Sequence, residues 1–190
     1  MWTRGAAIRP VPRYALVSEA LLDQIEQHED WDDESGIAER MARLPMLQPH
    51  IYDDVVDRKN DRIDDVAKAF HRAVTSRLVQ IFEAAFPGRV SPVEAQDLIA
   101  IDESLRVEEE LRAAHPEEPF DLDDVVSREQ PALILFLQRV LEETLESVSD
   151  QDVDLDDVHA MYRKILGYVL ALSQAVAAPA GNPQKERSLS

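Results

Sequence analysis

The sequence predicts an all-α fold, on three observations. Only 5 of the 190 residues are glycine, and Ala, Leu, Glu, Arg and Gln dominate the long segments, all of them residue types that favour helices. Apolar residues recur three and four positions apart over most of the chain. Pro131–Leu145 contains six consecutive apolar residues, Ala132–Leu137, so a helix through it must be covered on most sides. We therefore expect a helical bundle of about six helices with this segment at its centre.

The chain has the length of one domain with two terminal extensions. Residues 1–13 carry three arginines and two prolines, a composition typical of a basic extended arm. Residues 14–178 are predicted to form one all-helical domain. Residues 179–190 begin with a proline that ends the last helix, and their polar composition predicts a flexible tail.

Two helices are expected before residue 50. The first covers residues 14–29, and the second, residues 37–44, is stopped by Pro45. The acidic loop between them contains Trp31, which is either an anchor on the core or a contact for a partner.

A long helical pattern covers residues 51–86 and ends at Pro87-Gly88. The pattern lapses near Lys59, which falls on the apolar side. We therefore expect either one continuous helix or a break there, with Asn60 or Asp61 as the new N-cap.

The second half of the chain predicts helices over residues 93–114, 131–145 and 155–178. The pentapeptide Asp-Leu-Asp-Asp-Val occurs at 121–125 and again at 154–158, either as a duplication or as a coincidence of helix capping, since aspartate suits a helix N-terminus. The two most apolar helices are expected to pair as an antiparallel hairpin near the C-terminus.

Charge and composition restrict the classes of function. The formal net charge is -18, from 20 Lys+Arg and 38 Asp+Glu, and there is no cysteine. Such an acidic chain repels phosphate backbones, so we expect no direct nucleic-acid binding. The longest apolar run is far below the ~20 residues of a membrane span, and no secretory leader is visible. The sequence therefore predicts a cytoplasmic protein, not bound to a membrane, whose surface suits a basic partner protein.

The most suggestive motif is Asp53-Asp54-Val55-Val56-Asp57, or DDxxD. Carboxylates one turn apart on a helix can share a Mg²⁺ ion that bridges phosphate oxygens. Over these five residues the sequence resembles the aspartate-rich motif of isoprenoid synthases. The resemblance implies a Mg²⁺-dependent enzyme acting on a phosphate or diphosphate, with Asp53, Asp54 and Asp57 as metal ligands.

The same aspartates have a second interpretation, which we favour. On one continuous helix, Asp54, Asp57, Asp61 and Asp64 form a stripe opposite the apolar face, and such a stripe faces solvent or a partner. The leading hypothesis is thus a non-enzymatic acidic interaction module, without catalytic residues or cofactor, that binds a basic partner as an adaptor, regulator or immunity-type inhibitor. The predicted contacts are Asp30, Trp31, Asp32, Asp33, Glu34, Asp54, Asp57, Asp61 and Asp64.

Two further alternatives stay open. In a nucleic-acid mimic, the aspartate stripe would imitate phosphates and occupy a DNA-binding protein. In a structural homo-oligomer, the apolar runs Ala132–Leu137 and Ile165–Leu172 would exceed what one chain covers and would form the interface.

Overall fold

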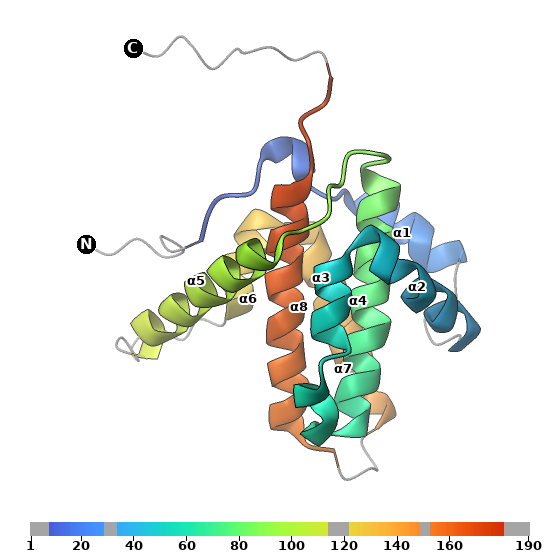
Figure 1. The fold of residues 1–190 in the computed structure, drawn as a ribbon, viewed down its shortest axis with the longest axis vertical. Helices are drawn as coiled ribbons and strands as arrows, with labels where there is room; N and C mark the ends of the chain where they lie inside the picture. The colour runs from blue at the N-terminus through green and yellow to red at the C-terminus, as the bar shows by residue number, and fades with distance from the viewer. Residues whose placement is uncertain (1–7, 29–33, 114–121, 149–152, 181–190) are drawn as a thin grey trace.

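The computed structural model is all-helical (Figure 1), which confirms the predicted fold class. It describes residues 8–28, 34–113, 122–148 and 153–180, and these ranges hold eight α-helices, two 3-10 segments and no strand. The elements are η1 Arg13–Ala15, α1 Glu19–His28, α2 Glu34–Leu47, α3 Pro49–Val55, η2 Arg58–Arg62, α4 Asp65–Ala85, α5 Ala95–Ala113, α6 Leu122–Glu129, α7 Pro131–Ser147 and α8 Leu155–Ala175.

The described ranges hold eight α-helices, whereas the sequence predicted about six. The long pattern over residues 51–86 is divided, and residues 122–129 form a helix of their own. The prediction that Pro45 stops the second helix is wrong, because α2 continues through it to Leu47. Two interactions stabilise this last turn. Leu44 is buried, and the Gln48 N–H donates to the Leu44 carbonyl at 2.8 Å.

The predicted break near Lys59 is confirmed, and the continuous helix is wrong. The cap of α4 is Asp64 rather than Asn60 or Asp61: its carboxylate accepts the N–H groups of Val66 at 2.8 Å and Ala67 at 3.2 Å. Asn60 is buried and donates its side-chain amide to the carbonyls of Asp54 at 2.9 Å and Val55 at 3.3 Å. It therefore satisfies the end of α3 instead of starting α4.

The centre of the fold is formed by α4 and α8, which lie side by side in Figure 1 and share the most extensive contact of any two helices. The expected hairpin of the two apolar helices is not confirmed, because the main backbone neighbours of α7 are α6 and α1. Leu141 and Leu145 of α7 still reach α4 and α8 through side chains, at a small cluster around Ala67, Val158 and Met161. This small cluster is thus shared among three long helices.

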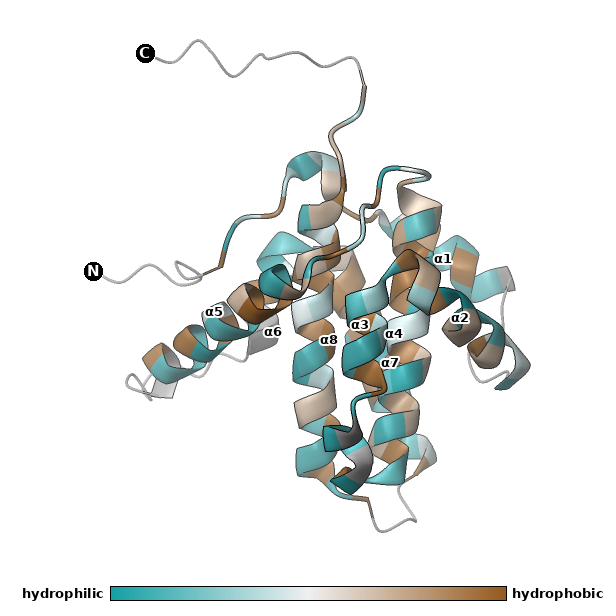
Figure 2. Cartoon of the chain, viewed as in Figure 1, coloured by the Kyte–Doolittle hydropathy of each residue, from teal (hydrophilic) through white to brown (hydrophobic). Residues whose placement is uncertain are grey.

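The apolar runs that suggested a homo-oligomer are covered by the chain itself. Leu133, Ile134, Phe136 and Leu137 are at most 1% exposed, and the residues of 165–172 are buried as well. Only Leu135 of the first run is largely exposed. Figure 2 shows that α5, by contrast, alternates apolar and polar residues along its length as it extends away from the bundle. Within the described ranges, no helix has both the length and the apolar character needed to cross a bilayer.

Two buried glutamines fix the junctions between helices. Gln48 and Gln130 precede the prolines that begin α3 and α7, and their backbones have nearly the same angles, φ -142°, ψ 73° and φ -141°, ψ 67°. The Gln130 amide donates to the Ala15 carbonyl at 2.7 Å and the Ser173 hydroxyl at 2.8 Å, and its oxygen accepts the Val17 N–H at 3.1 Å. It therefore joins the N-terminal segment to α8.

Gln48 makes the equivalent connection for α3. Its amide donates to the Ser91 carbonyl at 3.1 Å, and its oxygen accepts the Val93 N–H at 2.8 Å. The segment that leads into α5 is thereby attached to the start of α3.

The N-terminal segment contributes to the core from Ile8 onward. Ile8 and Val11 are buried, and the Val11 N–H donates to the Glu129 carboxylate at 2.5 Å. The predicted arm, residues 1–13, is therefore packed against the helices over its described part. Of the predicted tail, Pro179 and Ala180 are exposed, and the remainder lies outside the described residues.

Replacing Gln130 with Met, which keeps the length of the side chain, should lower the free energy of unfolding by about 2–4 kcal/mol, because buried backbone groups of Ala15 and Val17 lose their partners. Chemical denaturation measures the change. The matched control is Gln174→Met, since Gln174 makes one exposed bond, to the Arg9 carbonyl. A loss no larger than that of the control would show that Gln130 does not hold the segment.

Candidate functional site

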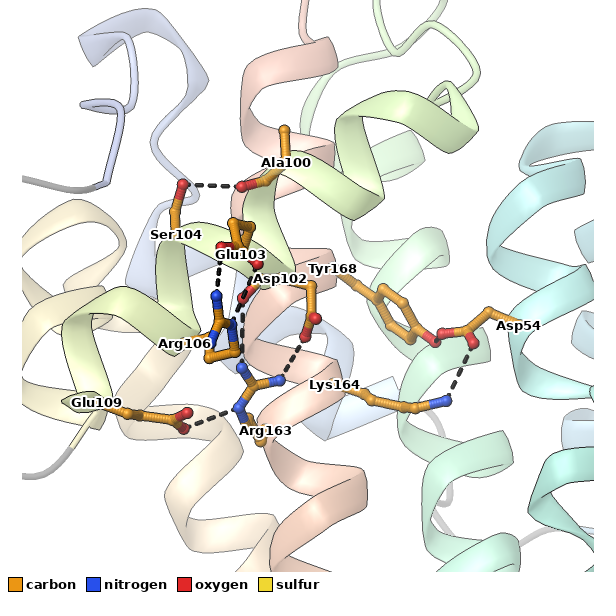
Figure 3. Close-up of polar contacts among 10 residues, drawn as sticks. All are labelled: Asp54, Ala100, Asp102, Glu103, Ser104, Arg106, Glu109, Arg163, Lys164 and Tyr168. Carbon is orange, nitrogen blue, oxygen red and sulfur yellow. Dashed lines mark hydrogen bonds and ion pairs between the residues drawn. The ribbon is translucent and has the colours of Figure 1, made fainter.

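Asp54 of the DDxxD motif joins α3 to α8 (Figure 3). The Tyr168 hydroxyl donates to one carboxylate oxygen at 2.5 Å, and the Lys164 ammonium donates to the other at 3.0 Å. Lys164 and Tyr168 lie one turn apart on α8, so both reach the same carboxylate. Both oxygens of Asp54 are therefore engaged within the protein.

Burial and the neighbouring Asp54 carboxylate raise the pKa of Tyr168 far above its ordinary value of 10.0. Both causes disfavour the phenolate. Tyr168 therefore stays a hydrogen-bond donor to Asp54 at any physiological pH, and it is unsuited to act as a general base.

His71 of α4 stacks on Tyr168, with ring centroids 5.7 Å apart and planes at 23°. It is 1% exposed, and its Nε2 has no hydrogen-bond partner among the described residues. Burial, and next the positive charge of Lys164, lower the pKa of His71 from 6.5 to about 4. The imidazole is therefore neutral at pH 7.

Arg163 of α8 attaches α5 to the bundle (Figure 3). Its guanidinium pairs with Asp102 at 2.5 Å and Glu109 at 2.8 Å. A second arginine, Arg106, pairs within α5 with Glu103 and Glu110. The two ion pairs of Arg106 are exposed, and exposed pairs contribute little to stability.

A groove of about 440 Å³ lies between α3, α5 and α8, and we call it the α5 groove. Leu98, Ile99 and Leu105 form its apolar side, and Asp54, Asp102, Arg163 and Lys164 line it with charges that are already paired. The carboxylate of Asp53, which also lines it, is 73% exposed and lies 4.0 Å from the Nδ1 of His50. The polar groups of this groove mainly satisfy one another.

A second groove of about 440 Å³ lies between α2, α4 and α7, and we call it the α7 groove. Its lining is mostly apolar, with Glu143 as its one charged residue among those described. Glu142 and Glu146, on the same helix, are exposed. The α7 groove thus combines an apolar floor with one carboxylate, that of Glu143.

The predicted stripe of aspartates does not lie on one helix face, because the chain breaks between α3 and α4. Asp57 caps η2 by accepting the Lys59 N–H at 3.0 Å, a bond that lowers the pKa of Asp57. Asp64 caps α4, and its own N–H donates to Asp157 at 2.7 Å. Together with Asp54, these carboxylates stabilise the fold.

The other predicted contacts are only partly described. Glu34 is exposed in the first turn of α2. The side chain of Asp61, which falls in η2, lies outside the described part of the chain, as do Asp30, Trp31, Asp32 and Asp33.

The Mg²⁺ alternative rested on Asp53, Asp54 and Asp57. Among the described residues, no group of three histidines or carboxylates is arranged to hold a metal ion. Binding at Asp54 would require it to release both Lys164 and Tyr168. The metal site stays a prediction.

Sequence reasoning missed the carboxylates Glu142, Glu143 and Glu146. They lie in the last two turns of α7, which has no basic residue in its last turn. Because the C-terminal end of a helix dipole is negative and its effect is confined to the last turn, Glu146 costs about 0.3–1 kcal/mol there. A carboxylate at this unfavourable position is the feature of the sequence that could have indicated an acidic surface on α7.

Comparisons with protein-family models, with curated proteins and with solved structures found no match for this chain. The two grooves and the charges beside them therefore carry the functional inference.

Acidification should destabilise the protein through His71. Its pKa is lower in the folded state, so the unfolded chain binds a proton first, and the stability present above pH 6.5 is lost as the pH falls toward 4. The loss from this group is about 3 kcal/mol at most. Unfolding measured across this range should show it, and His71→Phe should remove it while carboxylate contributions remain. An unchanged pH dependence in the variant would contradict the assignment.

Replacing Asp54 with Asn should lower the free energy of unfolding by about 1–2 kcal/mol, because Lys164 loses its partner. Asp53→Asn, at the exposed neighbouring position, is the matched control and should change it by less than about 0.5 kcal/mol. The difference in free energy of unfolding between the Asp54→Asn variant and the unchanged protein should be the same in urea denaturation with and without millimolar Mg²⁺. A stabilisation by Mg²⁺ that Asp54→Asn abolishes would instead support the metal alternative.

Proposed function

We propose that this protein is a non-enzymatic acidic interaction module that binds a basic partner protein, as an adaptor, regulator or immunity-type inhibitor does. The observation that carries the proposal is the set of exposed carboxylates on α7. Glu142, Glu143 and Glu146 have no ion-pair partner among the described residues, and Glu143 lines an apolar groove. The cytoplasmic location expected from the sequence is part of the proposal.

The net charge of -18 supports this proposal. A field of one sign accelerates the encounter with an oppositely charged partner and suppresses other partners. Lysines or arginines of a partner would also offset the repulsion between Glu146 and the C-terminal end of its own helix. The acidic surface therefore gains free energy on binding a basic surface.

The nucleic-acid mimic is a less suitable form of the same idea. A mimic needs a regular row of carboxylates, whereas Asp54, Asp57 and Asp64 belong to three different elements and are engaged in capping or pairing. A basic partner recognised through exposed glutamates on one helix requires no such row.

The proposal predicts that binding depends strongly on salt. Partners are captured by cross-linking to the full chain, identified, purified and measured by titration calorimetry. We expect a net basic partner whose Kd rises about tenfold or more from low to high salt, because the exposed charges are screened. A partner of acidic surface, or a Kd independent of salt, would overturn the proposal.

A further inference from the structure

We propose that the α7 groove binds one face of a basic amphipathic helix supplied by the partner protein. This inference rests on the proposed function and names the site and the kind of segment that it recognises. Three features of the groove support it: the apolar floor, the hydroxyl groups and the charges.

The floor of the groove is an unfilled helix-packing surface. From α4 come Val66, Ala69, Phe70, Ala73 and Val74, at the spacing of one helix face. The two alanines are small, so this face leaves space where larger side chains would have closed it. Such a surface takes aliphatic side chains that follow the same helical spacing.

The hydroxyl groups in the groove require nothing from a ligand. Thr144 donates to the Val140 carbonyl at 2.8 Å, and Ser147 donates to the Thr144 carbonyl at 2.7 Å. Because both donors are used within α7, the occupant needs no polar groups on the face that it buries. An apolar face therefore suits this floor better than a polar small molecule does.

A helix suits the groove better than an extended strand. The walls are helices, whose backbone groups are bonded internally, so they offer no edge to pair with a strand. A buried strand would leave its N–H and C=O groups without partners. A helix satisfies them itself, and it needs only side chains that fit the groove.

The charges select a basic partner helix over a second copy of this chain. Glu143 lines the groove, and Glu142 and Glu146 are exposed elsewhere on the same helix. Arg139, the nearest arginine on α7, is paired with Glu26 at 3.1 Å. A second copy would bring another chain of net charge -18 against these glutamates, whereas lysines flanking an apolar face complement them.

The probe is an amidated Leu/Lys peptide of about 15 residues, long enough to form a helix, with leucines at helical spacing. A peptide of the same composition with alternating Leu and Lys tests the helical form, and a Leu/Glu peptide tests charge. We expect the helical Leu/Lys peptide to bind the full-length protein at least about tenfold more tightly than either control. No binding of this peptide overturns the inference.

Two pairs of variants locate the binding. Ala69→Leu fills the groove from an exposed helical position, and Ala100→Leu makes the same change on α5. The triple change Glu142→Gln, Glu143→Gln and Glu146→Gln is matched by Asp53→Asn, Glu94→Gln and Asp97→Asn, which removes equal charge elsewhere. Each α7-groove variant should weaken binding about tenfold, and each control less than about threefold.

Equal effects of the variants and their controls overturn the inference. Salt-dependent binding of the captured partner would then still support the proposed function, so the two failures are distinguishable. A dimer mass in light scattering that Ala69→Leu abolishes also overturns the inference, in favour of a second copy as the occupant.

Discussion

The side-chain amide of Gln130 lies where the N-terminal segment, the start of α7 and α8 meet. Its two donors and its oxygen hold Ala15, Val17 and Ser173, and Gln48 makes the corresponding connection at the start of α3. These two amides fix the helices that form one wall of each groove.

The sequence was sufficient for the all-α class, because composition and spacing are local properties, and it indicated the break near Lys59 as one of two alternatives. It could not choose the cap of α4, since Asn60, Asp61 and Asp64 are all good caps. The choice depended on the carbonyls of α3, which Asn60 satisfies. Periodicity likewise showed that α7 and α8 are apolar without indicating that the main neighbour of α8 is α4.

The candidate site was harder to predict than the fold. The aspartate stripe assumed one continuous helix. Because the helix breaks, Asp57 and Asp64 become caps and Asp54 joins a half-buried pair. The α7 groove depends on the distance between helices that are far apart in sequence, which no local pattern encodes. The acidic surface of α7 did leave a trace in the sequence, because Glu146 lies in the last turn, where a carboxylate opposes the helix dipole.

Backbone hydrogen exchange of the protein, alone and with its captured partner, tests the central claim most directly. A helix seated in the α7 groove should slow exchange over residues 66–74 and 140–148, the stretches of α4 and α7 that line it, because bound segments open less often. Residues 95–105 of α5 should exchange as before. Protection confined to α5, or no protection of α4 and α7, would contradict the account.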